Sequence, residues 1–465
     1  MPQSLATSLA PPSKPPRPKA ARNIFWLIAE RGLKAVGGVG MAVLIARHLG
    51  PGHYGSYGAA IGLATLAKEA VMLGFDRMIR RDLAARPEDA GKIIGTSTML
   101  SLAISFVVAL GLSALAGQLV DDEETRRLTL IVVWMAVPSA FYSCENWFES
   151  SGQARPLVWT RNVVWILFVI SRVVLILNGA RVTAFAIVAL AEWAVTYAAV
   201  CGLLRKVHRN DFHFTFDLVQ FKAWFREGWP AVLIIVVGST ADRIMVLLAR
   251  NLASDHAAAG YLNAALRITE IWWSMSTIVA AVLLPRIVAL QKSDPVHAAK
   301  VTQLYANTSL LVGVGAAIAA TVTAPWVVPL LFGHAYAPSA LVLVILLWSG
   351  PAIFPAVARS QLWVIRGQLI LDLPTACCVS ICQLSLVRFL VPRYGAVGAA
   401  LSMATAQWVG VYGLTLCVPA LRRASQIQFH AFRALLSPGA TIRGLYDFVG
   451  KMVKSDEVSR RDAKG

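Results

Sequence analysis

The chain has 465 residues, of which 57% are hydrophobic and only 15% are charged, and its mean hydropathy is +0.61. Soluble domains average about 45–50% apolar and about 25% charged residues, so this composition excludes an ordinary soluble protein and indicates a membrane protein with many spans. The net charge of +18 does not indicate a nucleic-acid partner, because lysine and arginine cluster between alternate apolar blocks, as they do in cytoplasmic loops.

Apolar blocks long enough to cross a bilayer, which takes about 20 residues, alternate along the chain with short polar loops. The predicted fold class is an all-α integral membrane protein with about 12 transmembrane helices. Lysine and arginine are in excess on the side that holds both termini, which places both termini in the cytoplasm. The predicted spans are Asn23–Ala46, Tyr54–Phe75, Ile93–Gly117, Leu128–Glu149, Leu157–Leu177, Thr183–Leu204, Trp229–Arg250, Ala257–Leu284, Val301–Ala324, Ala340–Arg359, Leu362–Val391 and Ala396–Leu421.

The first and seventh spans are followed by similar turns, ARHLGPGHYGSYGAA and ARNLASDHAAAGYLNAA. Corresponding spans would have the same orientation, so we predict two six-helix lobes related by a parallel repeat around a central cavity. Within the connector between the lobes, Leu218–Phe225 fits either an amphipathic helix at the membrane interface or a solvated link. The predicted divisions are a disordered basic tail (1–22), the N-terminal lobe (23–204), a cytoplasmic connector (205–228), the C-terminal lobe (229–421) and a basic cytoplasmic tail (422–465).

Three stretches carry a resemblance to a known family: the turn ARHLGP..YG.Y, LGFDRMIRRDLA after the second span, and DRIMVLLARNLASDHAAAGYLNAALRI. They resemble bacterial polysaccharide flippases, the O-antigen and exopolysaccharide transporters of the multidrug/oligosaccharidyl-lipid/polysaccharide exporter superfamily. The resemblance extends from Arg22 to Arg422. It implies alternating access in the bacterial inner membrane, with an undecaprenyl-pyrophosphate-linked oligosaccharide as substrate for lipopolysaccharide or exopolysaccharide biosynthesis. It also implies a polysaccharide polymerase and its chain-length machinery as partners, besides the membrane lipids.

Ionisable residues deep inside the spans are the candidate functional residues, because charged side chains rarely face lipid. A pyrophosphate headgroup needs cations inside the protein. Arginine offers a planar fork that matches phosphate oxygens, and lysine offers a point charge. The alternative is that these charges only neutralise buried acids and join helices. The predicted substrate-binding residues are Arg31, Lys34, Lys68, Arg172, Arg243 and Arg267, all of them except Arg172 in the repeated helix pairs.

Sequence spacing predicts partners for several of these charges. Glu30 lies four residues before Lys34, and Arg267 lies three residues before Glu270, so a helix brings each pair together. Side chains that are adjacent in sequence diverge by about 100° on a helix, so those of Lys68–Glu69 and Asp242–Arg243 are expected to meet other helices.

Four acids are candidates for coupling transport to H⁺ or Na⁺: Asp242, Glu69, Glu192 and Glu270. A buried acid with a raised pKa can titrate, whereas a salt-bridged acid cannot. Glu145 and Glu149 lie near the cytoplasmic end of the fourth predicted span, and both are expected to be solvated.

The sequence holds no Walker A, HExxH or Gly-x-Ser-x-Gly motif, and none of its six cysteines forms a CxxC. We therefore predict no cofactor, no metal site and no catalytic residue. Two alternatives remain open. A cation-coupled multidrug or small-molecule exporter of the same superfamily would favour an acidic cation site. A membrane-embedded glycosyltransferase or polymerase would need a large loop with clustered acids or arginines.

Overall fold

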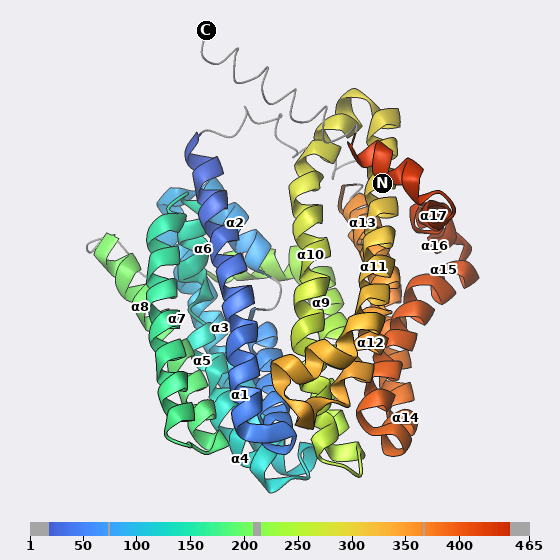
Figure 1. Cartoon of the computed structure of the whole chain (residues 1–465). Coiled ribbons are helices and arrows are strands. Elements are labelled where there is room, and N and C mark those ends of the chain that lie inside the picture. The colour runs from blue at the N-terminus through green and yellow to red at the C-terminus, as the bar shows by residue number, and fades with distance from the viewer. Residues whose placement is uncertain (1–17, 73–74, 208–214, 366–367, 447–465) are drawn as a thin grey trace. The chain divides into compact units, whose positions relative to one another are not determined.

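The computed structural model describes residues 18–72, 75–207, 215–365 and 368–446, and in these ranges all regular structure is helical (Figure 1). Seven helical segments of this part are long and apolar enough to cross a membrane, or eight if one bent pair of helices counts as a single span. The protein is therefore an all-helical, multi-pass membrane protein. The expectation of twelve spans stays a prediction.

The helices follow one another with short connections. The α-helices are α1 (Pro18–Met72), α2 (Asp76–Ala85), α3 (Ala90–Leu119), α4 (Glu123–Val132), α5 (Ala136–Ser139), α6 (Tyr142–Ser150), α7 (Ala154–Leu177), α8 (Val182–Val207), α9 (Leu218–Leu252), α10 (Ala257–Ser293), α11 (Pro295–Phe332), α12 (Ser339–Leu347), α13 (Gly350–Ile365), α14 (Asp372–Trp408), α15 (Leu414–Cys417), α16 (Pro419–Ala424), α17 (Gln426–Ala431) and α18 (Arg433–Leu436).

Helix α1 contains the first predicted span and most of the second. Its apolar part, Gly32–Met72, has 41 residues, and a straight helix of that length would measure about 60 Å, roughly twice the hydrocarbon thickness of a bilayer. The helix is instead broken at Gly50, whose φ of 71° lies in the left-handed region that favours glycine, and Pro51 follows. Helix α14 is broken in the same way at Gly395, where φ is 53°.

The chain divides into two compact units. Unit 1 contains the described residues within Met1–Met41 together with Ala67–Leu115 and Leu130–Trp229. Unit 2 contains Ala42–Leu66, Ala116–Thr129 and the described residues of Pro230–Gly465. Unit 2 thus takes in the break of α1 and the turn between α3 and α4. The predicted lobe boundaries at 204 and 229 stay a prediction, and residues 1–17 and 447–465 of the predicted tails lie outside the described part.

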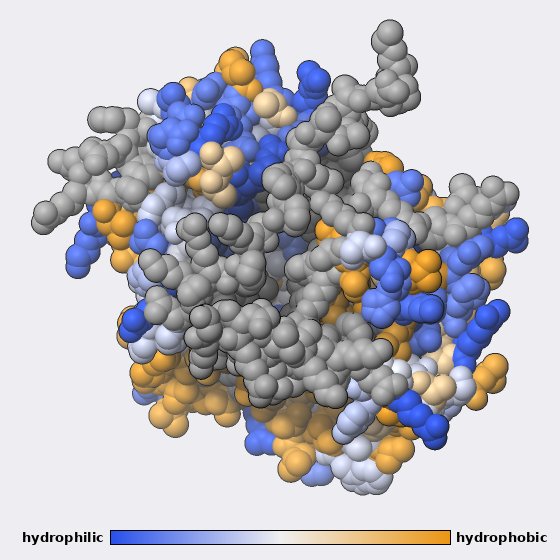
Figure 2. All heavy atoms as spheres, turned by 90° about the horizontal axis from the view of Figure 1, so that it is seen from above, coloured by the Kyte–Doolittle hydropathy of each residue, from blue (hydrophilic) through white to orange (hydrophobic). Residues whose placement is uncertain are grey.

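In unit 1, α7 packs along α8 and α2 packs on α6 (Figure 1). The apolar core includes Ala67 and Val71 of α1 with Val133 and Ala136. The view from above shows hydrophilic and hydrophobic residues interspersed over the described part of this face (Figure 2).

The buried carboxylate of Asp82 on α2 forms hydrogen bonds with side chains near the start of α9. Asp82 accepts hydrogen bonds from Nε1 of Trp224 and Nε2 of Gln220, both at 2.8 Å, and forms an ion pair with Arg81 at 3.0 Å. Burial raises the pKa of Asp82, but the hydrogen bond from Trp224 and the bond and charge of Arg81 outweigh it, so the pKa lies below its ordinary value. Helical structure for the predicted segment Leu218–Phe225 is confirmed, whereas its place at the membrane interface stays a prediction.

In unit 2, α11 packs on α12, α13 and α17, and Tyr305 and Leu310 lie in its apolar core. Helices α17 and α18 fall in the segment that the sequence analysis assigned to the C-terminal tail. Gln428 of α17 is fully buried, donates to Val411 O at 2.9 Å and accepts from Nη1 of Arg359 at 3.0 Å. Val411 belongs to a π-helical turn, Val409–Gly413, whose wider spacing changes the backbone hydrogen-bond pattern. The packed part of unit 2 therefore continues past residue 421.

The second segment of α1 packs very closely on α10. A Cβ added to Gly260 would lie 2.6 Å from the carbonyl carbon of Pro51 and closer still to its oxygen, and a Cβ on Gly55 would lie 2.6 Å from Gly260 N. Only glycine allows two backbones to approach this closely. Gly55 and Gly260 belong to the two similar turn sequences, ARHLGPGHYGSYGAA and ARNLASDHAAAGYLNAA. The close contact between the two helices explains why each of these positions is a glycine.

Candidate functional site

The first charged cluster lies in unit 2, where α9 and α10 each place an arginine more than two turns inside the helix. Nη1 of Arg243 lies 3.3 Å from Oε1 of Glu270, and Nη1 of Arg267 lies 3.4 Å from Oε2. At 1.5 Å per residue, Arg243 comes about 13 Å before the end of α9, and Glu270 about 20 Å after the start of α10. The three side chains are 33% to 40% exposed. Two positive charges thus share one carboxylate. The sequence spacing predicts the contact of Glu270 with Arg267, and the contact with Arg243 comes from the fold.

Tyr54, from the second segment of α1, supports Arg267 from the side. Its side chain is buried, and its hydroxyl forms a hydrogen bond with the Arg267 guanidinium. The backbone oxygen of Tyr54 accepts from Nδ2 of Asn263 at 3.3 Å, and its ring lies edge-on to Tyr336 with the centroids 6.2 Å apart. The close contact between α1 and α10 therefore also positions an arginine of the cluster.

Asp242 and Arg243 are adjacent on α9 and meet different helices. Nε2 of the fully buried Gln383 on α14 donates to Oδ1 of Asp242 at 3.1 Å, whereas Arg243 reaches Glu270 on α10. This divergence is the one that the sequence analysis predicts from helix geometry, and it is confirmed.

The second charged cluster lies in unit 1, between α1, α6 and α7. Buried Glu30 accepts a hydrogen bond from Nζ of Lys34 at 2.7 Å and forms an ion pair with Nε of Arg161 at 3.0 Å. Nη1 of Arg161 lies 3.6 Å from Oε2 of Glu145, whose side chain is only 17% exposed. The predicted pairing of Glu30 with Lys34 is confirmed. The expectation that Glu145 is solvated is wrong, because α7 places Arg161 beside it.

The other predicted residues of unit 1 have varied surroundings. Nζ of Lys68 lies over the ring of Trp193, 4.5 Å from its centroid, which is cation–π geometry. Nη2 of Arg172 lies 2.5 Å from Oε2 of Glu192, with side chains only 10% and 17% exposed. Glu69 is half-buried on α1. The side chain of Arg31 lies outside the described part, so its predicted role stays a prediction.

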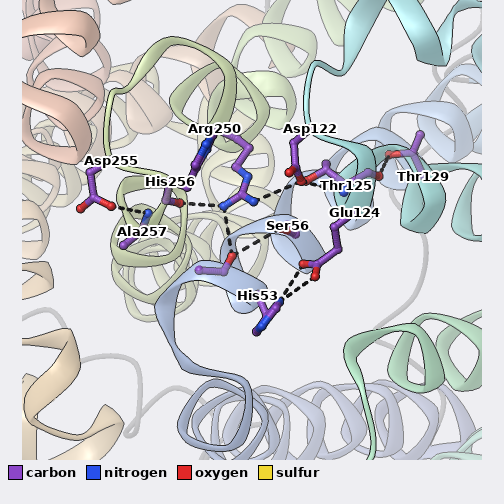
Figure 3. A network of polar contacts seen from close by, with 11 residues as sticks. His53, Ser56, Asp122, Glu124, Thr125, Thr129, Arg250, Asp255, His256 and Ala257 are labelled. Carbon is purple, nitrogen blue, oxygen red and sulfur yellow. Dashed lines mark hydrogen bonds and ion pairs between the residues drawn. The ribbon is translucent and has the colours of Figure 1, made fainter.

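A polar network joins three turns of unit 2 (Figure 3). Nη1 of Arg250 donates to the carbonyl oxygens of Gly52 and His256 at 3.3 and 3.0 Å, and Nη2 lies 3.1 Å from Oδ2 of Asp122. Asp122 also accepts from N and Oγ1 of Thr125 at 2.8 and 2.6 Å. Burial raises the pKa of Asp122, but the bonds from Thr125 and the charge of Arg250 outweigh it, so the pKa lies below its ordinary value.

Arg47 occupies the same position in the first turn sequence as Arg250 in the second, and it also donates hydrogen bonds to backbone carbonyl oxygens. Its Nε donates to Leu331 O at 2.7 Å, and its Nη2 donates to Leu330 O at the end of α11. The last carbonyls of a helix lack partners within the helix, and a cation there is favourable. Each repeated arginine therefore binds backbone carbonyls near a turn of unit 2.

Among the described residues, no group of three or more His, Cys, Asp or Glu side chains could hold a metal ion. The titratable side chains gathered in the spans instead combine acids with arginine or lysine. Such clusters can hold an anion or move a proton.

A family model described as "Polysaccharide biosynthesis protein" matches residues 20–291, more than half of the chain. The chain belongs to this family. One similar protein is the capsular polysaccharide biosynthesis protein CapF from Staphylococcus aureus. The two sequences are 21% identical over 209 residues, which is 45% of this chain and 52% of that protein. The match thus spans about half the length of that relative.

Among solved structures, an inward-facing multidrug resistance MATE family transporter of the MOP superfamily is similar with a TM-score of 0.68 and 17% identity, covering 86% of this chain and 99% of the other. The lipid II flippase MurJ in an inward closed conformation is similar with a TM-score of 0.66 and 15% identity, covering 89% and 92%. At these identities the likeness shows the fold alone. This polysaccharide biosynthesis protein has the MATE/MurJ-like fold of multi-pass MOP-superfamily transporters.

Two charged residues of this family member, Arg161 and Glu145, were missed as site candidates by the sequence analysis. Each lies on a different helix from its partner, and no local spacing links them. The signal in the sequence was the position of Arg161, which lies seven residues into α7 and inside the predicted span Leu157–Leu177.

Proposed function

We propose that the protein is a flippase that moves undecaprenyl-pyrophosphate-linked oligosaccharide units across the bacterial inner membrane, for O-antigen or exopolysaccharide biosynthesis. The observation that carries this proposal is the pair of arginines, Arg243 and Arg267, that share the single carboxylate of Glu270. Membership of the polysaccharide biosynthesis family supports the biological role, and the fold shared with a lipid II flippase is compatible with a lipid-linked substrate.

The solvent exposure of this cluster supports a site for an anion. Charged side chains inside a span rarely face lipid, so the exposure of Arg243 and Arg267, about a third each, supports the proposal that they border a water-filled space. Two unit charges 4 Å apart attract each other by about 4 kcal/mol at an effective dielectric constant of 20. An attraction of that size offsets a substantial part of the cost of taking a pyrophosphate out of bulk water.

The transport cycle that we propose is alternating access by two six-helix lobes, with twelve crossings and both termini in the cytoplasm. The breaks at Gly50 and Gly395 support this number of crossings, because each divides a long helical run into two segments. The arginines of the repeated turns, Arg47 and Arg250, join segments from both halves of the sequence within unit 2. We propose that these contacts open when substrate leaves. A polysaccharide polymerase would receive it.

We propose that one of the four candidate acids, Asp242, Glu69, Glu192 or Glu270, couples transport to H⁺ or Na⁺. Glu192 lies 2.5 Å from Arg172, and Glu270 contacts two arginines. One contact of Asp242 is with the amide of Gln383, which donates to it at 3.1 Å.

The proposal is tested by Arg243→Ala and Arg267→Ala in a strain that lacks the chromosomal gene. A hydrogen bond to a charged group contributes about 1.5–3 kcal/mol, so each variant should export about tenfold less polysaccharide, or lower still. Lipid-linked repeat units should accumulate on the cytoplasmic side. The matched control is Arg127→Ala, an exposed arginine paired with Glu123, which should export normally.

Normal export by both cluster variants at wild-type protein levels would refute the proposed role of the arginines. Loss of resistance to a cationic drug, with polysaccharide unchanged, would favour the multidrug exporter instead.

A further inference from the structure

Glu270 is placed to act on the arginines that the proposed function assigns to the pyrophosphate. Its two carboxylate oxygens are divided between two guanidinium groups, Oε1 toward Arg243 and Oε2 toward Arg267. The carboxylate therefore occupies the same donors that a phosphate oxygen would use.

We propose that Glu270 is an internal counter-anion, which holds Arg243 and Arg267 in the empty protein and exchanges with the pyrophosphate of the substrate. This inference rests on the proposed function and adds a means of release to it. When the pyrophosphate departs, the carboxylate returns to the arginines and replaces its charge. Glu270 is thus a positioning residue that limits how tightly the substrate binds.

The geometry of the pair suits an exchange. Charge-assisted N–H···O contacts are normally about 2.7–2.9 Å long, whereas the two contacts of Glu270 measure 3.3 and 3.4 Å. The carboxylate is also 40% exposed, and an ion pair with that access to water contributes little to stability. Water can solvate the displaced carboxylate, so its departure carries a small cost.

A second ion pair of the same chain shows the opposite geometry. Arg172 and Glu192 approach to 2.5 Å, and their side chains are 10% and 17% exposed. Breaking that pair would leave charges with little access to water, which is strongly unfavourable. The contrast separates a pair that holds α7 to α8 from a pair that is open to exchange.

Charge balance explains why a transporter benefits from such an exchange. Removing the carboxylate of Glu270 takes one negative charge away from Arg243 and Arg267. A doubly charged pyrophosphate diester would then bind more tightly to the two arginines, but it would leave more slowly. A transport site must bind firmly enough to load and weakly enough to unload, as it must in ion channels.

The test measures binding of inorganic pyrophosphate to purified full-length protein by titration calorimetry at low salt, together with polysaccharide export in cells. Glu270→Gln removes the competing charge and keeps the shape, so we expect binding to tighten about tenfold, a change of roughly 1.4 kcal/mol, while export falls. Glu270→Asp, whose shorter arm reaches both arginines less well, should shift both readouts in the same directions by less. Glu123→Gln, on an exposed pair with Arg127, is the matched control and should behave as wild type.

Tighter binding with slower export distinguishes the counter-anion from a structural residue, whose loss would weaken both. Unchanged or weaker pyrophosphate binding by both Glu270 variants would overturn the inference, even if Arg267→Ala abolishes binding and the proposed function stands. If wild-type protein binds no pyrophosphate and Arg267→Ala exports normally, the proposed function fails, and the inference fails with it.

Discussion

Substituting Gly260 by alanine tests the close contact between α10 and the turn of α1. The new Cβ would lie 2.6 Å from the carbonyl carbon and 2.8 Å from the Cα of Pro51, distances that require the backbone of one segment to move. Overpacking of this kind typically costs about 1–3 kcal/mol. Alanine also stabilises a helix interior by about 1 kcal/mol relative to glycine, so that gain must be subtracted before the packing cost can be read.

Gly315→Ala supplies that correction, because a Cβ at Gly315 in α11 of the same unit meets nothing within 4 Å. The difference between the two variants isolates the packing cost, which we expect to be about 1–3 kcal/mol. The measurement is the thermal unfolding midpoint of detergent-solubilised protein at one scan rate, since such unfolding is often irreversible. Gly260→Ala should melt below wild type and Gly315→Ala at or above it. A Gly260→Ala midpoint equal to that of Gly315→Ala would show that the contact is not so close.

Two further substitutions test buried polar contacts, each scored by the same midpoint. Asp82→Asn should lower it at pH 7 by weakening the contacts to Trp224. The depressed pKa of Asp82 gives stability that is present above its ordinary value of 3.8 and is lost as the pH falls through the lower folded-state pKa, so the variant should lose less stability than wild type in acid. Gln428→Leu leaves Arg359 without its amide partner and should cost about 1–3 kcal/mol, whereas the exposed Gln426→Leu should be neutral; equal midpoints would contradict the assignment.

Local spacing could predict the contacts that a helix makes with itself. Glu30 with Lys34 and Arg267 with Glu270 were predicted because 3.6 residues per turn place such neighbours on one face, and both pairs are present. The composition and the apolar blocks likewise predicted an all-helical membrane protein with many spans. These properties depend on a few consecutive residues and on the bilayer.

Contacts between distant helices could not be predicted in the same way. Arg161 reaches Glu30 across 131 positions of the chain, and Trp224 reaches Asp82 across 142. Such pairs depend on which helices become neighbours and on their rotation, neither of which appears in any short stretch. The second arginine on Glu270 is of this kind, because Arg243 comes from α9. One half of the candidate site was therefore predictable, and the other half required the fold.

Position within a predicted span selected both Arg172 and Arg243, although Arg172 lies towards the outer end of its span, and the two arginines differ in access to water. A charge pair closed off from solvent can be exchanged only at the cost of stranding its partner, and Arg172 with Glu192 is such a pair. A pair that is a third exposed or more is already solvated, so an incoming anion replaces a weak contact. We therefore propose that Arg172 holds α7 to α8, while Arg243 and Arg267 serve the substrate. The property that separates these roles is whether the partner carboxylate can leave, and Glu270, with long contacts and an open face, can do so.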